Sequence, residues 1–490
     1  MKALFSENSV NCNDIVFSKK VLLKEGALYK IFPASIEISG NQIINVTKLS
    51  LESYQASIQK ETELKNRNIH DFGDRIVTPA FINCHTHVAM NFFRTFFQQN
   101  SKSNNIIEEF FYKAESALTP DDVRAFARIG AYENILNGNG LIWDHYYYGN
   151  EIANACSDVG ISAVIAPTIQ DLSGPGMKFH QEMINETIEI FSNSTFEKAG
   201  IYSAFGPHAT DTVSKDMWLK ILNLSEEYKI PIHTHVSQSL EEVSRIYKKY
   251  KKTPIQYLDS LGITKNTASN LFVHCIYLNN SDLKILQAKN NSLVFCPFSQ
   301  LIFQSPANII EWDKHKIKWF IATDCVASND SMNLQKELKL VAGFPKFQAT
   351  FSLNSKLISK FSDKTKKQFL KDTLKINKTY HKFSDPSFLL HKVFEGPGTF
   401  HNFFKAGIIQ TGALANLIVW DVDHPALWPC DNFPKALAMG DTTGAIYNMM
   451  VGGKWISKNG NFINGLLNSD KYQSHLNEAK SRLKNLLKKL

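Results

Sequence analysis

The chain has 490 residues, of which 43% are hydrophobic and 20% are charged, and its formal net charge is +8. This length allows a large core and more than one domain, and the composition is that of an ordinary globular protein. The sequence shows no signal peptide and no apolar run long enough to span a bilayer, so we expect a cytoplasmic protein rather than a secreted or membrane-embedded one.

Short apolar runs separated by turn residues occupy both ends of the chain. They predict strands near the N-terminus and again near the C-terminus, at residues 27–31, 35–38, 43–46, 416–421 and 445–451. Gly452-Gly453 follows the last of these runs and predicts a hairpin. We therefore expect a small β-sandwich domain formed from both termini, residues 1–76 and 406–465.

In the middle of the chain, apolar strands alternate with helical stretches, a pattern typical of α/β folds with parallel strands. Thr119-Pro120, followed by two acids, predicts the start of a helix that continues to about Leu136. Eight strands are predicted, at residues 76–87, 141–144, 161–167, 200–205, 230–235, 271–274, 292–296 and 317–324. Eight is the number of strands in a (β/α)8 TIM barrel, so we expect this fold for residues 77–405.

Two further segments are predicted to be helical. The stretch from about 340 to 400 is rich in Lys, Phe and Ser, and we expect helices that lie over the barrel. Residues 466–490 combine leucines at helical spacing with six basic residues, which predicts a C-terminal basic helix. We expect this helix to pack on its own or a neighbouring subunit, as in a homodimer, and not to bind nucleic acid or a membrane.

Polar side chains follow the predicted strands at the points where these strands end. His85 and His87 end the first strand, and residues i and i+2 of a strand share a face, so both imidazoles can reach one point. Neutral imidazole is the commonest protein ligand for zinc and similar metals. The other polar residues at strand ends are His208, His235, His274 and Asp324. Since the chemistry of such barrels lies at the C-terminal ends of the strands, these residues predict a metal site there.

Several of these stretches resemble the signatures of the amidohydrolase superfamily. They are residues 78–87, ending in His-Thr-His, Gly206-Pro207-His208, His233-Thr234-His235, residues 272–275 and residues 323–329. The branch with the strongest resemblance contains the single-metal aminohydrolases and chlorohydrolases, which include adenosine-type, guanine and triazine hydrolases. The resemblance covers nearly the whole chain, including the split β domain.

The resemblance implies one divalent metal, zinc or iron, held by His85, His87, His235 and Asp324. His235 is preferred over His233 because the family places its ligand three residues before a catalytic Glu, and His233 is the alternative ligand. A metal of this kind converts bound water to hydroxide near neutral pH.

The resemblance also implies roles for the residues around the metal. Asp324 would accept a proton while it touches the metal, and His274 would orient the hydroxide and stabilise the oxyanion that develops. His208 would contact the substrate. The predicted mouth of the barrel is aromatic, which suits a planar heterocycle, with Phe92, Phe93, Phe96, Phe97, Phe110, Phe111, Tyr112, Tyr146, Tyr147 and Tyr148.

Two positions depart from the family pattern. Gln238 stands where the family has the Glu that protonates the substrate ring, and an amide can form hydrogen bonds but cannot deliver a proton as an acid. Glu241 and Glu242 are expected to lie too far into the next helix to replace it. After the seventh strand, residues 295–300 read Phe-Cys-Pro-Phe-Ser-Gln instead of the family's His-Asn-Pro-x-Ser-Asn.

The sequence is therefore compatible with three functions. The first is a metal-dependent hydrolase that acts on a non-peptide carbon–nitrogen bond of a small N-heterocyclic substrate, a deamination by metal-bound hydroxide. In the second, the bond is an amide, amidine or carbon–halogen bond, and Gln238 only positions the substrate. The third is a non-catalytic family member that binds a heterocycle, which is disfavoured because every expected metal ligand is present.

Overall fold

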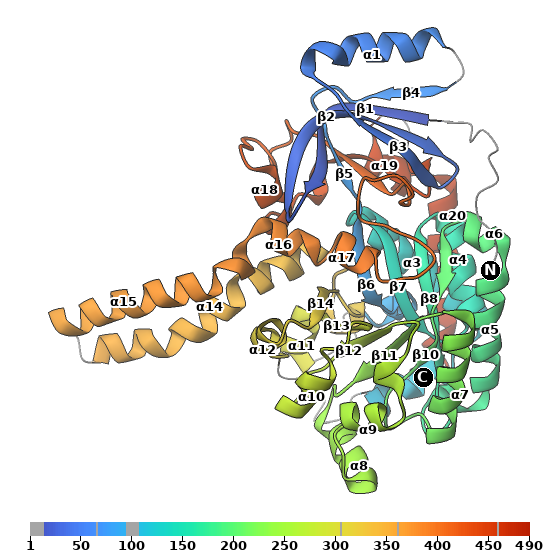
Figure 1. Cartoon of the computed structure of the whole chain (residues 1–490). Coiled ribbons are helices and arrows are strands. Elements are labelled where there is room, and N and C mark those ends of the chain that lie inside the picture. Colours follow the sequence, from blue (N-terminus) through green and yellow to red (C-terminus); the bar gives the residue numbers. More distant parts are fainter. Residues whose placement is uncertain (1–13, 65–66, 95–106, 304–305, 360–361, 458–459) are drawn as a thin grey trace.

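The computed structural model describes residues 14–64, 67–94, 107–303, 306–359, 362–457 and 460–490. Its centre is a set of parallel strands surrounded by helices, with a second, mostly antiparallel sheet above it (Figure 1). The prediction of an α/β chain is confirmed. No helix in the described ranges is long and apolar enough to cross a membrane.

The central strands form two parallel sheets. The first contains β6 (Phe81–Thr86), β7 (Asn139–Tyr146), β8 (Ser162–Ile169), β9 (Ile201–Ser203) and β10 (Gly206–Pro207), and the second contains β11 (Ile232–Val236), β12 (Asn270–His274), β13 (Asn291–Phe295) and β14 (Lys318–Ile321). A parallel bridge between Phe205 and Ile232 joins the two sheets. At the other junction, the Thr323 N–H donates to Asn83 Oδ1 at 3.1 Å, and Asn83 Nδ2 donates to Thr323 Oγ1 at 2.8 Å. The strands thus follow one another in the order and closure of a (β/α)8 barrel.

Helices connect these strands on the outside of the ring. The predicted helix start at Thr119 is confirmed, because the Thr119 and Asp122 side chains form a reciprocal capping box with each other's backbone N–H groups at the start of α3 (Pro120–Leu136). The other connecting helices are α4 (Gly149–Val159), α5 (His180–Ser192), α6 (Ser194–Lys198), α7 (Lys215–Tyr228), α8 (Leu240–Tyr250), α9 (Pro254–Ser260), α10 (Asn280–Ile285), α11 (Pro297–Phe303) and α12 (Ile309–Lys314).

Strands from both ends of the chain share one eight-stranded sheet. Its order is β17-β16-β15-β5-β1-β2-β3, and β4 also pairs with β1. The strands are β1 (Asp14–Glu25), β2 (Leu28–Ser39), β3 (Gln42–Lys48), β4 (Asn68–Asp71), β5 (Ile76–Pro79), β15 (Leu417–Trp420), β16 (Ile446–Val451) and β17 (Lys454–Trp455). The predicted hairpin at Gly452-Gly453 is confirmed by the antiparallel pairing of β16 with β17. The chain passes from this sheet into the barrel between β5 and β6.

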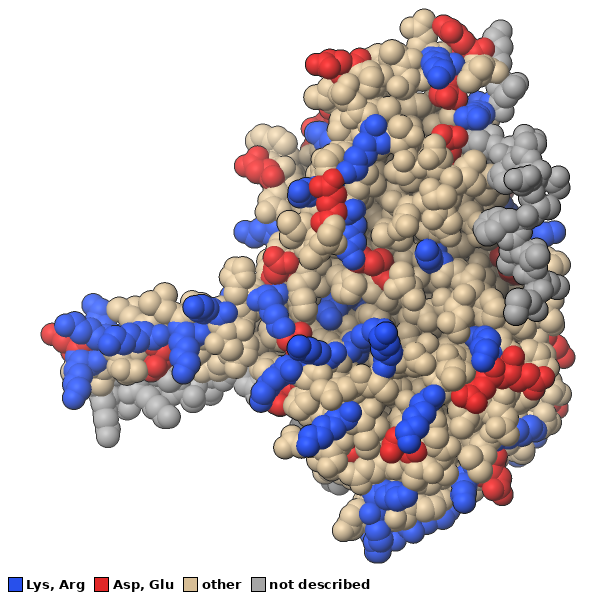
Figure 2. All heavy atoms as spheres, in the orientation of Figure 1, with Lys and Arg blue, Asp and Glu red and all other residues tan. Residues whose placement is uncertain are grey.

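The expectation that residues 340–400 lie over the barrel is wrong for most of this segment. Helices α14 (Leu334–Ser359) and α15 (Asp363–Tyr380) project side by side from the body as an arm, and lysines line its surface (Figures 1 and 2). No residue of α15 is buried, because its lysine-rich sequence offers few apolar side chains for packing. The chain returns to the body in α16 (Pro386–His391) and α17 (Glu395–Gly398).

The C-terminal basic helix packs on its own chain. Helix α20 (Asp470–Leu486) contacts α3, and Arg482 forms ion pairs of 3.2 Å with both Asp121 and Asp122 at the start of that helix. Arg128 of α3 pairs with Glu478 at 2.8 Å. The two Arg482 ion pairs therefore use part of the positive charge of α20 within the chain.

Candidate metal centre and active-site cavity

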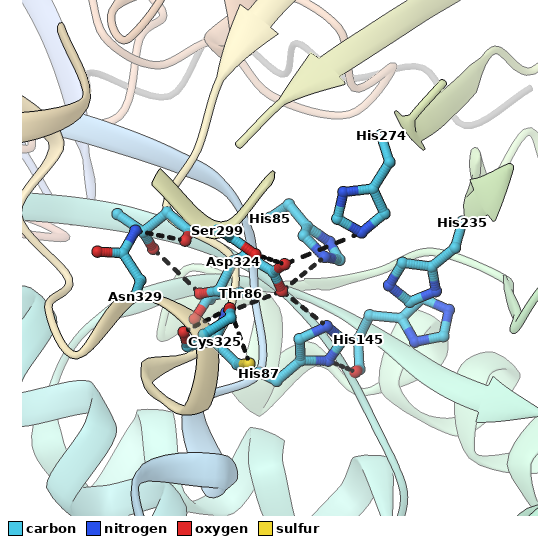
Figure 3. Close-up of polar contacts among 12 residues, drawn as sticks. His85, Thr86, His87, His145, His235, His274, Ser299, Asp324, Cys325 and Asn329 are labelled. Atoms are coloured by element: carbon cyan, nitrogen blue, oxygen red, sulfur yellow. Dashed lines mark hydrogen bonds and ion pairs between the residues drawn. The ribbon is translucent and has the colours of Figure 1, made fainter. Parts of the chain in front are cut away.

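The four predicted metal ligands meet at the C-terminal ends of the barrel strands. The ring centroids of His85 and His87 are 4.7 Å apart, and that of His235 lies 5.0 Å from His85 and 5.4 Å from His87. Oδ1 of Asp324 lies 3.6 Å from His85 Nε2 and 3.4 Å from His87 Nε2 (Figure 3). Ligand atoms of His85, His87 and His235 all lie within 4.8 Å of one another, and the same holds for His85, His274 and Asp324.

In His85, His87 and His235, the Nδ1 atom contacts a hydrogen-bond partner on the side of the ring away from the other ligands. This contact directs Nε2 towards the centre of the cluster. The partners are His233 Nε2 for His85, at 2.9 Å, the His145 carbonyl for His87, and the His208 carbonyl for His235, at 3.0 Å. His85 Nε2 is buried and has no hydrogen-bond partner among the described residues. Because ligating histidines in proteins are oriented by such Nδ1 contacts, this donor set fits a divalent cation. His233 supports His85 here.

The protonation of the cluster also suits a metal. Burial lowers the pKa of His85 to about 3 and that of His235 well below its usual value. Burial alone would raise the pKa of Asp324, but the close approach of its carboxylate to His85 and His87 outweighs burial and holds that pKa well below the usual range. The pKa of His87 is raised, because Asp324 more than offsets the effect of burial. Neutral imidazoles and an ionised carboxylate are the forms that bind a cation, so His85, His235 and Asp324 are held in these forms, whereas a bound cation would have to displace any proton on His87.

Backbone strain is concentrated around this centre. Ser237 after β11, His274 and Cys275 at the end of β12, and Asp324 after β14 all have positive φ, between 46° and 73°. Non-glycine residues adopt this region at a free-energy cost, and the surrounding structure has to hold them there. For Asp324, this support comes from the Ser299 hydroxyl, which donates to Oδ2 at 2.6 Å, and from the Cys325 N–H, which donates to Oδ1 at 2.8 Å.

The remaining predicted site residues face one cavity beside the metal ligands. His274 Nε2 lies 3.9 Å from Asp324 Oδ2, His208 Nδ1 contacts Thr212 Oγ1 at 3.1 Å, and Gln238 follows β11. Burial lowers the pKa of His208 to about 3. The cavity, including its open mouth, encloses about 1050 Å³. Its lining residues include His87, Met90, Phe111, Tyr112, Glu115, His145, Tyr146, Tyr147, Thr168, His208, His235, Gln238, Glu241, His274, Ser299, Gln300 and Asp324.

The two acids after Gln238 have different positions. Glu241 lines the cavity and lies in the first turn of α8, not a turn or more into it as expected, while its inability to replace the family's acid stays a prediction. Helix α8 begins at Leu240, directly after the strand-end loop, and its first turn therefore still faces the site. Glu242 instead accepts a hydrogen bond from the Gln238 N–H at 2.8 Å and another from the Thr210 hydroxyl. It supports the loop that carries Gln238.

The predicted aromatic residues divide into two groups. Phe111, Tyr112, Tyr146 and Tyr147 line the cavity. The others among the described residues pack elsewhere: Phe92 stacks on Phe126, Phe93 and Phe110 contact each other, and Tyr148 stacks on Phe179. Phe96 and Phe97 lie outside the described residues.

Several polar residues of the site were missed by the sequence reasoning, among them Glu115, His145, Thr168 and Ser299. Glu115, at the end of α2 (Tyr112–Glu115), lines the cavity, and burial raises its pKa to about 7. His145 also lines it. The sequence could have indicated His145, because side chains along a strand alternate between its two faces. Trp143 of β7 faces the barrel interior, and His145, two residues further, lies on the same face. Ser299 lay in a stretch that departs from the family pattern, yet its hydroxyl contacts Asp324. No local pattern marks Glu115.

Comparisons with known proteins agree with this geometry. A sequence profile of the amidohydrolase family matches residues 76–456. A relative named 5'-deoxyadenosine deaminase, from Methanocaldococcus jannaschii, is 26% identical over 429 residues, which cover 87% of this chain and 92% of the relative.

Solved structures share the fold. A zinc-bound adenosine deaminase from Xanthomonas campestris has a TM-score of 0.77 and 17% identity, covering 97% of this chain and 99% of that one. An atrazine chlorohydrolase from Arthrobacter aurescens, complexed with zinc, has a TM-score of 0.72 and 16% identity, covering 96% and 100%. With its profile match over residues 76–456, the chain belongs to the amidohydrolase family and is a hydrolase.

Proposed function

We propose that the protein is a metal-dependent aminohydrolase that removes the amino group from an adenine-type heterocycle, such as a nucleoside. The observation that carries this proposal is the convergence of His85, His87, His235 and Asp324 beside one cavity. The deaminase name of the Methanocaldococcus relative supports a carbon–nitrogen bond of an adenine ring as the target.

The donor set supports zinc as the single metal, with iron as the alternative. Imidazole nitrogens and carboxylate oxygens are ligands that zinc binds in proteins, and the cavity beside them would admit a water or substrate atom. When bound there, such a cation polarises water and makes a nucleophile available near neutral pH. His85, His87, His235 and Asp324 would hold it.

The residues around the metal would divide the remaining tasks. Asp324, kept ionised by its histidine neighbours and oriented by Ser299, can accept a proton from the attacking water. His274 lies beside Asp324 Oδ2 and can donate a hydrogen bond to the oxygen that develops negative charge. His208, at the end of β10, can contact the heterocycle. The buried Glu115 offers carboxyl oxygens to hydroxyl groups on a substituent of that heterocycle.

Gln238 favours a second candidate function. Its amide lines the cavity and can bind a ring nitrogen, but it cannot supply the proton that would make the leaving amine easier to expel. Hydrolysis of an amide, amidine or carbon–halogen bond, with Gln238 only positioning the substrate, needs no such proton on the ring. The similarity in fold to an atrazine chlorohydrolase is compatible with this chemistry. A non-catalytic binding role is disfavoured, since all four candidate ligands are in place.

We further propose the domain boundaries expected above: residues 1–76 with 406–465, residues 77–405 and residues 466–490. The pairing of β5 with β15 supports the joining of both ends in one unit. Whether this unit is a β-sandwich, whether the protein is a homodimer and whether it is cytoplasmic stay predictions.

The test uses protein purified without chelator, with its metal content measured. The zinc-loaded protein is incubated with adenosine, with 5'-deoxyadenosine and with halogenated triazines, and released ammonia or halide is assayed. We expect ammonia from the nucleosides and about one zinc per chain. Asp324→Asn should abolish turnover. Halide release without ammonia would favour the second candidate, and a protein that takes up no metal in excess zinc and turns over nothing would refute both.

A further inference from the structure

The barrel end carries one histidine to which neither the metal nor the proposed chemistry assigns a task. This residue is His145, near the end of β7. We propose that His145 determines substrate specificity by forming a hydrogen bond from Nε2 to a nitrogen of the heterocycle in the cavity. The inference rests on the proposed function, since it needs an N-heterocycle in that position.

The strand places the His145 ring at the floor of the cavity. Leu141 and Trp143 belong to the apolar cluster inside the barrel, and His145 continues the same row two residues later. On the neighbouring strand β8, Val164 and Ala166 form the equivalent row. Thr168 is the next residue of that row, so both His145 and Thr168 reach the cavity and line it.

Of the two ring nitrogens of His145, Nδ1 has a hydrogen-bond partner and Nε2 has none among the described residues. His145 Nδ1 lies 2.9 Å from Thr168 Oγ1, and the His145 carbonyl accepts a hydrogen bond from His87 Nδ1. Nε2 is buried and has no hydrogen-bond partner among the described residues, while the side chain lines the cavity. The residue is only 1% exposed. An unpaired buried polar atom is costly, so an unpaired nitrogen beside a cavity calls for a hydrogen-bond partner in that cavity.

The His145 ring lies close to both a candidate metal ligand and the predicted substrate contact. The His145 ring centroid lies 4.8 Å from that of His235 and 6.1 Å from that of His208. His145 belongs to neither group of residues whose ligand atoms converge on a common point. Its Nε2 is therefore left for a group that enters the cavity.

The Thr168 contact is compatible with a donor role for Nε2. A neutral imidazole carries a proton on one nitrogen only. The Thr168 hydroxyl lies 2.9 Å from Nδ1 and can donate to it. In that tautomer, which the proposal assigns, the proton lies on Nε2 and can be donated to a group in the cavity. Ring nitrogens with a lone pair, as in adenine-type heterocycles, are the matching acceptors.

The experiment combines a variant with single-atom changes in the substrate. Zinc-loaded wild-type protein and His145→Phe are compared on adenosine, 3-deazaadenosine and 7-deazaadenosine, each deaza compound lacking one ring nitrogen. We expect His145→Phe to lower kcat/KM for adenosine about 5- to 50-fold, mainly through KM, the usual effect of losing one buried hydrogen bond. One deaza compound should show a similar loss with the wild-type protein and no further loss with the variant.

Two variants and two physical readouts separate specificity from structure. His145→Gln retains a donor near the position of Nε2 and should recover part of the loss. His180→Phe changes a half-buried histidine of α5 that does not line the cavity, and it should match the wild-type protein. Bound zinc, measured by mass spectrometry, and the thermal unfolding midpoint should be the same in all variants.

Each contrary result has its own meaning. If His145→Phe lowers kcat/KM equally for all three compounds, for none of them, or only through loss of zinc, the specificity role is refuted while the aminohydrolase proposal stands. If the zinc-loaded wild-type protein deaminates none of the three, the proposed function fails and this inference fails with it.

Discussion

Ser299 donates a hydrogen bond of 2.6 Å to Oδ2 of Asp324, the carboxylate whose other oxygen faces His85 and His87. Ser299 is buried at the start of α11, after the seventh strand of the barrel. Oδ2 is the carboxylate oxygen that does not face His85 and His87. Because Ser299 binds this oxygen, the hydrogen bond fixes the rotation of the carboxylate. A residue from one strand end thereby sets the geometry of a candidate ligand from the next.

We expect Ser299→Ala to reduce activity or zinc affinity about 10- to 100-fold, the usual effect of losing a group that orients a metal ligand. Zinc titration and steady-state kinetics measure the two effects separately. Ser328→Ala is the matched control, because Ser328 also lines the cavity but its hydroxyl donates to the Cys325 carbonyl. Equal behaviour of both variants would contradict the orienting role of Ser299.

Gln238→Glu restores an ionisable group at a position that lines the cavity. Proton delivery to a leaving group typically contributes about 10²- to 10⁴-fold. We expect faster deamination of adenosine and a new limb in the pH dependence of kcat, in which the gain is lost as the pH rises through the pKa of the new carboxyl. Glu242 contacts the Gln238 N–H and would raise the pKa of the new carboxyl, so the gain should be largest at mildly acidic pH.

The control for Gln238→Glu is Gln238→Ala, which removes the amide without adding an acid. It should raise KM while adding no new limb to the pH profile. Unchanged turnover of every substrate by Gln238→Glu would show that this position does not contact the reacting ring.

Asn83 closes the ring of strands. Its amide donates to Thr323 Oγ1 at 2.8 Å and to Asn134 Oδ1 at 3.1 Å, and it accepts from the Thr323 N–H at 3.1 Å. Asn83→Ala leaves these buried groups unpaired, so we expect the free energy of unfolding to fall by about 2 to 4 kcal/mol. Urea denaturation measures this change. Asn185→Ala, at an exposed position of α5, should change it by less than about 0.5 kcal/mol.

Glu395 joins the terminal sheet to the barrel helices. Its carboxylate contacts Lys24 of β1, Tyr29 of β2 and His391 of α16, the last at 2.7 Å. Burial would raise the pKa of Glu395, but the hydrogen bonds from His391, Lys24 and Tyr29 outweigh it and lower the pKa from 4.5 to about 2. The ionised form is therefore the one that stabilises the fold.

Because the folded-state pKa lies below the unfolded one, this contribution is present above pH 4.5 and is lost as the pH falls from 4.5 to about 2. It amounts to about 3 kcal/mol at neutral pH. We expect Glu395→Gln to lose about this much at neutral pH and to show a smaller decline in acid, measured by urea unfolding across the pH range. Glu227→Gln, at an exposed position, should follow the wild-type protein at every pH.

Local patterns in the sequence were sufficient for the strand order and for the place where the candidate metal ligands come together. His85, His87, His235, His274 and Asp324 each end a predicted strand, and the parallel barrel brings such ends to one side. The Thr119 helix start and the Gly452-Gly453 hairpin were also predicted correctly, since caps and tight turns depend on a few adjacent residues.

Only the tertiary structure decided which side chains complete the cavity and where α14 and α15 lie. Glu115 reaches the site from the end of α2, and Glu241 reaches it because α8 starts directly at the strand end. The free nitrogen of His145 follows from a hydrogen bond to Thr168, 23 residues away. Such contacts join residues far apart in sequence, so their geometry depends on packing and not on any local period.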